Sequence, residues 1–403
     1  MQRQLVYMDA KSSKFWNIEL SGSSHTVTYG RIGTNGQSST KSFPSEEAAK
    51  KDADKLVKEK LGKGYVDAGE LKSGATAASG SGAGDGQIPF IAFNGINHRD
   101  EVGSNAGTFI GKRVTDYDPK KDAKSDVVYR FRSDYDNDEL VPNLEDFLAT
   151  NAALEANALI IGAWHGDDSE RTPAEVLEVL IKSKDRLPKL AAIYVGDIVS
   201  EENEMSWINQ TDLSPLFSAF PKLQFVRARG GQGLELATPK HAALRALTLE
   251  TGGMDVSVIR SICTSDFPEL EYLELWLGTD EYGASATVAD LQPILSGRLF
   301  PKLKYLGLRN SQIVDEIAGV VVNSPLMQRI ETLDLSLGVL TDEGGHALLQ
   351  IPAGSTVKKL NLHYNYMTAE MIRKLKALPL TVDASKTRDS DGDDEWRFVA
   401  VGE

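Results

Sequence analysis

His165 is the strongest candidate for acid–base chemistry in this sequence. It is followed by three acidic residues, Asp167, Asp168 and Glu170, in a polar stretch after an apolar run. A histidine beside carboxylates can transfer protons, although the same residues are typical of a solvated loop. The six histidines, at positions 25, 98, 165, 241, 346 and 363, lack metal-ligand spacing, and no Gly-x-Ser-x-Gly nucleophile motif occurs. We therefore expect no catalytic residue and no enzymatic activity.

Three further motifs suggest ligand chemistry, and each has a plainer interpretation. The glycine-rich Gly230–Gly233 lacks the Lys-Ser/Thr of a P-loop, so a tight turn is favoured. The acidic runs Asp134–Asp138 and Asp389–Glu395 lack the sixth-position glycine of a calcium loop and are interpreted as solvated loops. A single cysteine, Cys263, excludes an internal disulfide and any multi-cysteine metal site. We expect no bound metal and no cofactor.

Composition is that of an ordinary globular protein. The chain has 403 residues, 41% hydrophobic and 25% charged, which suggests two or three domains. It contains no apolar run of about 18 residues, the length that a membrane helix requires, and its first residues lack a signal-peptide pattern. These features predict a cytoplasmic protein with no membrane partner.

Charge is unevenly distributed along the chain. The net charge is −14, yet residues 1–66 carry eleven Lys/Arg and seven Asp/Glu, a balance of +4, which leaves −18 for the remainder. A basic head on an acidic body indicates different partners for the two parts. The alternative is that the acidic surface only maintains solubility.

Residues 67–87 separate two differently patterned regions. They include Ser73–Gly86, which is almost wholly Gly, Ala and Ser and is predicted to be a flexible linker. The predicted strands before it are Gln4–Met8, Lys14–Leu20 and His25–Arg31. A helix is predicted from Ser45 onward. Residues 1–66 are thus expected to form a small antiparallel sheet with one helix.

Four blocks in this small domain resemble the WGR family. They are Phe15-Trp16-Asn17-Ile18, Tyr29-Gly30-Arg31-Ile32-Gly33 with Gln37, Lys41-Ser42-Phe43, and Lys60 with Gly64-Tyr65. The tryptophan that names the family is replaced by Tyr29, which retains an aromatic ring. WGR domains of eukaryotic poly(ADP-ribose) polymerases contact DNA ends and neighbouring domains, so the resemblance implies Tyr29 and Arg31 as the nucleic-acid contact pair. The alternative is that Tyr29 packs on the sheet and Arg31 forms a local salt bridge.

An L-x-x-L-x-L pattern recurs through the rest of the chain. Its blocks begin at Leu190, Leu223, Leu244, Leu270, Leu303, Ile330 and Val357, with a looser one at Ala158. Amphipathic stretches that predict helices lie between them. One strand and one helix in each unit of about 28 residues is typical of the longer leucine-rich repeats, whose leucines stack into a continuous core.

We therefore predict an α/β protein. The predicted regions are a WGR-like domain at 1–66, a linker at 67–87, an N-terminal cap at 88–157, and a leucine-rich-repeat solenoid at 158–403 with a parallel concave sheet, convex helices and a C-terminal cap. The caps are predicted to contain strands at Pro89–Asn94, Asp126–Phe131, Leu380–Asp383 and Trp396–Val401 and a helix at Leu144–Leu154. A WGR domain followed by such repeats resembles bacterial proteins of the molybdate metabolism regulator-like family.

The side chains flanking the inward leucines are predicted to point to the open side of the sheet, because side chains alternate along a strand. These positions are Tyr194, Phe225, Arg227, Arg229, Thr248, Glu250, Tyr272, Glu274, Trp276, Tyr305, Arg309, Asp334, Asn361 and His363. Aromatic and arginine side chains are enriched at protein-binding hot spots. We expect an exposed protein-binding face; the alternative is that the rings stack into a structural ladder.

These features favour a non-enzymatic adaptor that binds a protein partner on the concave face, with the WGR-like module as a second contact. The alternative is a DNA-associated regulator whose residues 1–66 bind nucleic-acid ends. A hydrolase or metalloenzyme is the least favoured function. Nucleic acid is expected to bind only through residues 1–66, because the acidic remainder repels phosphates.

Overall fold

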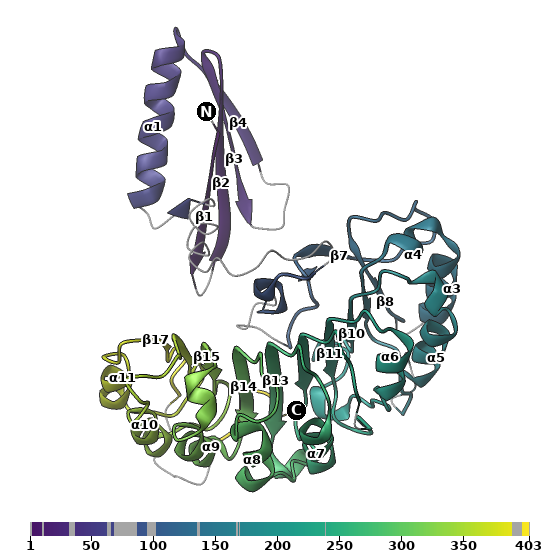
Figure 1. Ribbon diagram of the computed structural model, residues 1–403. Coiled ribbons are helices and arrows are strands. Elements are labelled where there is room, and N and C mark those ends of the chain that lie inside the picture. Colours follow the sequence, from purple (N-terminus) through teal and green to yellow (C-terminus); the bar gives the residue numbers. More distant parts are fainter. Residues whose placement is uncertain are drawn as a thin grey trace. The chain divides into compact units, whose positions relative to one another are not determined.

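The chain divides into two compact units, residues 1–85 and 86–403, each with its own sheet (Figure 1). The computed structural model describes residues 2–9, 12–31, 37–62, 66–67, 87–94, 102–134, 138–166, 168, 170–237, 239–388 and 397–402. The predicted linker at Ser73–Gly86 lies outside the described residues.

The first unit is an antiparallel sheet in the order β4-β3-β2-β1-β5 with one helix, α1, packed on it. Its elements are β1 (Gln2–Asp9), β2 (Ser12–Ser21), β3 (Ser24–Arg31), β4 (Gln37–Ser42), α1 (Glu46–Gly62) and β5 (Val66–Asp67). Trp16 and Ile18 alternate inward along β2 and pack against Ala53 and Val57 of α1. Residues two apart in a strand point to the same side, as do residues four apart in a helix. The apolar residues at these spacings therefore face each other and form this small core.

The second unit is built on a sheet of twelve strands that lie side by side in sequence order. The strands are β6 (Thr108–Phe109), β7 (Lys112–Asp116), β8 (Val128–Phe131), β9 (Ala158–Ile161), β10 (Ala192–Val195), β11 (Phe225–Arg229), β12 (Ala246–Glu250), β13 (Tyr272–Gly278), β14 (Tyr305–Ser311), β15 (Thr332–Asp334), β16 (Lys359–Asn361) and β17 (Thr381–Asp383). All neighbouring pairs from β7 to β17 are parallel, and β6 pairs antiparallel with β7.

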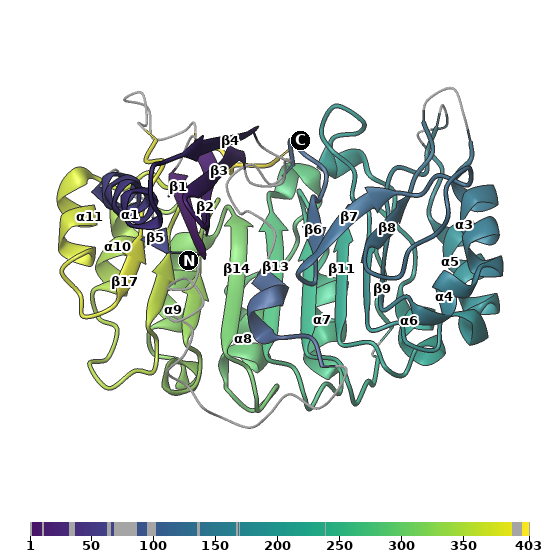
Figure 2. The ribbon, with the colours of Figure 1, turned by 90° about the horizontal axis from the view of Figure 1, so that it is seen from above.

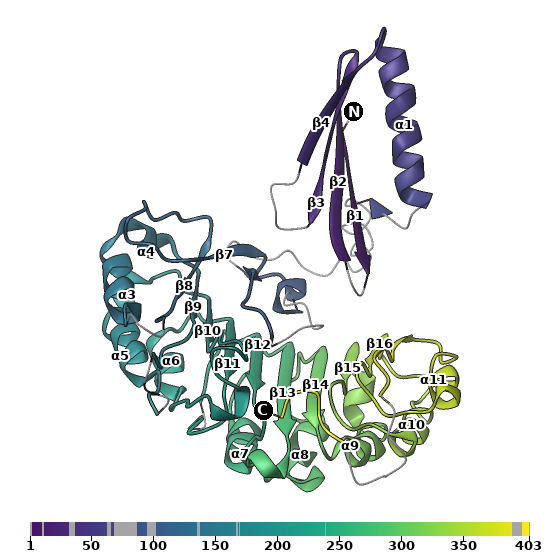
Figure 3. The same cartoon turned by 180° about the vertical axis from the view of Figure 1, so that it is seen from behind.

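Helices cover the outer face of this curved sheet, as Figure 3 shows. They are α3 (Leu140–Ala149), α4 (Asn151–Glu155), α5 (Ala174–Lys182), α6 (Ser214–Ala219), α7 (Val256–Thr264), α8 (Val288–Leu295), α9 (Val314–Val321), α10 (Asp342–Leu348) and α11 (Ala369–Leu375). Short 3₁₀ helices are η1 (Phe90–Asn94), η2 (Lys184–Arg186), η3 (Met205–Trp207), η4 (Asp280–Tyr282) and η5 (Pro325–Gln328).

The two faces of the large sheet carry different residues. One leucine of each strand lies beside the corresponding leucine of the next strand, from β12 to β15: Leu247, Leu273, Leu306 and Leu333. These leucines belong to one core that includes residues of the helices. The intervening side chains, such as Tyr272, belong to a separate cluster on the opposite face. The alternation predicted from the repeated leucines is therefore present in the structure.

Three predicted cap elements differ from the structure. Pro89–Asn94 contains the 3₁₀ helix η1, not a strand, because its aromatic side chains pack down onto the sheet face. The predicted helix at Leu144–Leu154 is interrupted at Thr150, whose extended backbone (ψ 160°) separates α3 from α4. The described part of Trp396–Val401 contains no strand. Residues 88–157 also do more than cap the sheet, since they supply β6, β7 and β8.

Candidate functional site

Tyr29 is an accessible aromatic residue of the first unit. It lies on β3 between Trp16 of β2 and Gln37 of β4. Directly opposed residues of antiparallel strands share a face, so Tyr29 lies on the same side as α1. Trp16 is buried there, whereas 44% of Tyr29 is exposed. Arg31 is the last residue of β3, and its side chain lies outside the described residues.

Four lysines are exposed on the helix of this unit. They are Lys50, Lys51, Lys55 and Lys58 of α1. The acidic residues Glu46 and Glu47 stand in the first helical turn, where they complement the helix dipole. Over its whole length α1 is neutral, with five lysines and five acidic residues, and its exposed lysines are the groups that can neutralise phosphates.

A hydrogen bond between a histidine of the sheet and a carboxylate of α1 joins the helix to the sheet. His25 is buried on β3 and its Nε2 donates to Oδ2 of Asp52 on α1 over 2.9 Å. Lys41 of β4 lies 3.5 Å from the same oxygen. The hydrogen bond from His25, assisted by the charge of Lys41, holds the pKa of Asp52 below its ordinary value.

The Asp52 carboxylate is expected to make the first unit sensitive to acid. Because its pKa is lower in the folded than in the unfolded state, its contribution is complete above the unfolded pKa of about 3.9 and is lost as pH falls through the folded pKa. Amide-exchange protection of α1 should decline over this range in the wild type and change less in Asp52→Asn. Glu46→Gln, at an exposed position, is the control. An equally steep decline in Asp52→Asn would contradict the assignment.

The predicted protein-binding face is buried, so the prediction that these side chains are exposed is wrong. No member of the set exposes more than 7% of its surface. The buried positions are Tyr194, Phe225, Arg227, Arg229, Thr248, Glu250, Tyr272, Glu274, Trp276, Tyr305, Arg309, Asp334, Asn361 and His363. They do lie on the face opposite the leucines, but that face is covered.

The covering is a segment of the same unit. Figure 2 shows η1 and β6 in front of the central strands. The ring of Phe93 in η1 meets Phe225 edge-on with centroids 5.4 Å apart, and Phe90 meets Tyr272 at 6.4 Å. Phe109 of β6 lies 5.3 Å from Phe225. Burying apolar side chains is favourable, and most of those of residues 88–93 pack on the aromatic side chains of the sheet face opposite the leucines.

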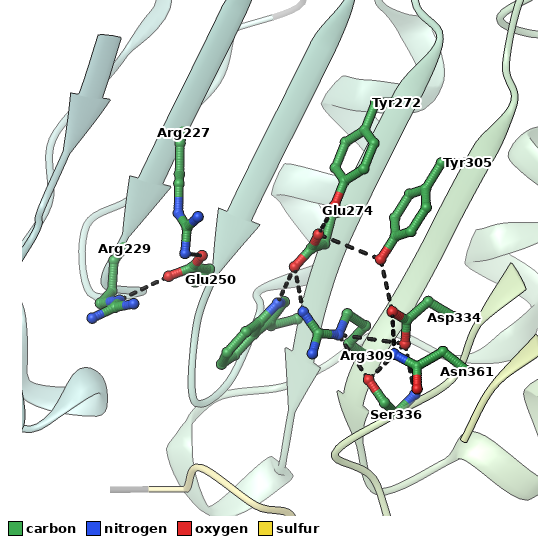
Figure 4. Close-up of polar contacts among 11 residues, drawn as sticks. Arg227, Arg229, Glu250, Tyr272, Glu274, Tyr305, Arg309, Asp334, Ser336 and Asn361 are labelled. Carbon is green, nitrogen blue, oxygen red and sulfur yellow. Dashed lines mark hydrogen bonds and ion pairs between the residues drawn. The ribbon is translucent and has the colours of Figure 1, made fainter. Parts of the chain in front are cut away.

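Two charge networks fill the polar part of this face (Figure 4). In the first, Glu250 forms ion pairs with Arg227 and, over 2.7 Å, with Arg229. Arg227 also lies over the ring of Tyr194 at 4.7 Å, and Arg229 donates to the carbonyl of Ile198 over 2.8 Å. A single carboxylate thus holds two buried guanidinium groups.

The second network is centred on Glu274 and Arg309. Glu274 Oε1 accepts from Arg309 over 2.7 Å and from the indole of Trp276 over 2.8 Å. Arg309 also lies 3.5 Å from Asp334, which accepts from Tyr305 over 2.8 Å.

Tyrosine and amide side chains complete this second network. Asn361 donates to Asp334 over 2.7 Å, and Tyr272 donates to Glu274. Tyr272 and Tyr305 stack with centroids 4.0 Å apart and planes inclined by 7°, as the structural-ladder alternative predicted. Burial raises the pKa of both phenols, which therefore remain hydrogen-bond donors. The two networks together contain three arginines and three carboxylates, so their charges cancel. We interpret these side chains as stabilising the sheet.

The residues around His165 that could do acid–base chemistry do not all line one cavity. His165 lines a cavity of about 190 Å³ together with Arg132 and Glu202, which form an ion pair. Its Nε2 lies 3.1 Å from the carbonyl oxygen of Glu202. Asp168 and Glu170 are exposed and do not line the cavity, and Asp167 lies outside the described residues. Sequence reasoning missed Glu202 because it comes from a distant loop.

The described residues of the other candidate motifs have structural explanations. Gly230 and Gly233 adopt positive φ of 111° and 69° in a turn after β11, as the turn interpretation predicted. Asp138 accepts from Ser133 and pairs with Arg171, and residues 389–395 lie outside the described residues. Cys263 is half-buried in α7, where burial raises the pKa of its thiol.

Neither a metal centre nor a bilayer-spanning helix is found in the described ranges. Among these residues, no group of three or more His, Cys, Asp or Glu side chains is placed to hold a metal ion. Within the same part of the chain, no helix combines the length and hydropathy needed to cross a membrane.

Comparison with known proteins identifies the first unit. Residues 1–72 match the WGR domain family. Over 65 residues, 16% of this chain, the sequence is 45% identical to two Escherichia coli proteins, protein YehF and the uncharacterised protein YfeS. The match spans 27% and 24% of those proteins, about a quarter of their length. The chain therefore carries a WGR domain at its N-terminal end.

A crystal structure that resembles this chain over its full length is among the similar solved structures. It is the crystal structure of a Bacteroides fragilis protein determined as a structural-genomics target. The similarity covers 100% of this chain and 99% of that one, with a TM-score of 0.68 and 28% identity. The structural similarity thus extends over both units of this chain.

Proposed function

We propose that this protein associates with nucleic-acid ends through its WGR domain, with Tyr29 and Arg31 as the contact pair. The observation that carries the proposal is the 44% exposure of Tyr29 on a domain whose family is of the nucleic-acid-binding type. The balance of +4 in residues 1–66 supports it, because the rest of the chain is acidic. No reaction is required of the protein in this role.

The proposed contact has two physical parts. The Tyr29 ring stacks on the terminal base or its sugar, an interaction worth about 1–3 kcal/mol per base. Arg31 and the exposed lysines of α1 neutralise phosphates, which supplies affinity without sequence preference and makes binding sensitive to salt. A duplex end suits this arrangement because its last base pair leaves one ring face uncovered.

Replacing Tyr29 by alanine in the full chain is expected to weaken binding to blunt-ended duplexes about 5- to 150-fold, whereas Tyr29→Trp retains binding. Fluorescence anisotropy at about 50 mM and about 200 mM salt measures both affinity and salt slope. Arg31→Ala should reduce the slope by about one.

The matched control is Trp207→Ala, which removes an exposed aromatic residue (55%) from the second unit and should leave DNA binding unchanged. Closed circular DNA, which has no ends, should bind more weakly than the blunt duplex. Equal binding of both DNA forms, or of wild type and Tyr29→Ala, would reject the proposed contact.

For residues 158–403 we propose a leucine-rich-repeat solenoid, as in the molybdate metabolism regulator-like proteins that the sequence resembles. Supporting this are the sequential strand order and the parallel pairing of the repeated leucines. An adaptor function through the predicted concave residues is not part of the proposal, because those side chains are buried. Among them, the aromatic residues pack with η1 and β6 or, in the case of Trp276, with Val401.

A further inference from the structure

Residues Phe398–Gly402 cross the carboxyl-end edge of the large sheet. They contact the loop after β16 at Tyr364 and Tyr366, the loop after β15 at Leu337, and β14 at Asn310. Strands are about 4.8 Å apart and an extended chain rises about 3.3 Å per residue, so a five-residue segment matches the span of these strand ends. The segment follows the edge from strand to strand.

The contacts to this segment are directed at its main chain. The side-chain amide of Asn310 makes both possible bonds to Val401, donating to its carbonyl over 2.5 Å and accepting from its N–H over 3.0 Å. The N–H of Ala400 donates to the Leu337 carbonyl over 2.7 Å. Tyr366 accepts from the N–H of Phe398 over 3.1 Å and donates to its carbonyl over 3.0 Å. Such contacts recognise an extended backbone and leave most side chains free to vary.

Val399 and Val401 are the two buried side chains of the segment. Val399 and Val401 are 5% and 8% exposed, whereas Phe398 is 55% exposed. Val401 packs with Met205, Trp276 and Leu337. This alternation is the period of an extended strand, with small β-branched residues at every second position.

The edge is shaped to admit a backbone at close range. A Cβ added to Gly252 would lie 2.5 Å from the carbonyl oxygen of Gly402 and closer still to the hydroxyl of Ser206, which donates to that same oxygen. The glycine is therefore needed where the segment approaches the sheet edge. The buried amide of Asn310 is held at a positive φ of 51°, a conformation that asparagine tolerates better than most residues.

We propose that this edge is a peptide-binding groove for an extended, uncharged partner segment with valine-like residues at alternate positions, and that residues 398–402 occupy it in cis. The cis segment fits the groove through contacts that any peptide of the same backbone form can make. Being tethered, it competes at an effective concentration in the millimolar range, so a partner peptide enters only after the cis segment is released. The groove is thus autoinhibited.

The test uses a fluorescent, end-blocked peptide with the sequence Phe-Val-Ala-Val-Gly and the full chain. Val401→Asp places a charge in the apolar pocket beside Trp276 and releases the cis segment without changing the groove itself. This variant should bind the peptide at least tenfold more tightly than wild type. Phe398→Ser, which alters only an exposed side chain, is the matched control and should behave as wild type.

A second probe separates main-chain recognition from apolar adhesion. The peptide methylated on the nitrogen of its second valine cannot donate to Asn310 and should bind Val401→Asp at least tenfold more weakly. Failure of Val401→Asp to bind the peptide while retaining the wild-type unfolding midpoint, or equal binding of the methylated peptide, would overturn the proposal. Wild-type dimers that Val401→Asp cannot form would also overturn it, in favour of exchange between two copies.

Discussion

Replacing Arg309 by methionine is expected to destabilise the second unit by about 3–5 kcal/mol, the usual cost of removing one partner from a buried ion pair. Arg309 is 1% exposed and lies between Glu274 and Asp334, at 2.7 Å and 3.5 Å. Without the guanidinium, two buried carboxylates face each other with no cation between them. Urea unfolding followed by circular dichroism measures the loss as a lower midpoint.

The matched control for this prediction is Arg260→Met. Arg260 also pairs with a carboxylate, Asp290, at 3.0 Å, but its side chain is 67% exposed. Surface pairs contribute about 0–1 kcal/mol, so this variant should unfold close to the wild type. Equal losses in the two variants would show that the buried network has no special role. Removing Glu274 as well should restore part of the stability, because the two side chains are coupled.

Replacing Phe93 by alanine is expected to loosen the cover over the aromatic face of the sheet. Phe93 is 3% exposed, meets Phe225 at 5.4 Å and lies under the guanidinium of Arg245 at 5.2 Å. Truncating a buried phenylalanine lowers the free energy of unfolding by about 3–5 kcal/mol. Here we expect local detachment of η1, so the loss cannot exceed the free energy with which η1 packs on the sheet. Residues 87–94 should become sensitive to proteolysis, and the uncovered rings should bind a hydrophobic dye.

Ile91→Ala is the control from the same 3₁₀ helix. Ile91 is 73% exposed, so its truncation should change stability by no more than about 0.5 kcal/mol. If both variants resist protease and exclude the dye equally, η1 does not depend on Phe93 for docking. The pair of variants therefore tests directly whether the chain occupies its own concave face.

The buried networks give a physical reason why the covered face is polar. Glu250 joins Arg227 and Arg229, all on adjacent strands β11 and β12. An ion pair of this kind contributes little net stability compared with apolar packing, but a strand shifted in register would leave its charges unpaired. We expect the networks to specify strand register in a sheet whose leucine face is nearly uniform.

Local patterns in the sequence predicted most of the architecture. The blocks around Trp16 and Tyr29 indicated the WGR domain, and the spacing of leucines such as Leu273 and Leu306 predicted parallel strands with alternating faces. These features depend on residues close in sequence, whose periodicity is dictated by the geometry of a strand or a helix.

The sequence alone determined on which side of the sheet a side chain such as Glu274 lies. Only the tertiary structure decided whether that face would meet solvent. Phe93 and Val401 lie far along the chain from the strands they cover, in non-repeating segments whose sequence has no period to indicate a partner. Burial of a sheet face depends on such long-range packing, which alternation along a strand does not encode.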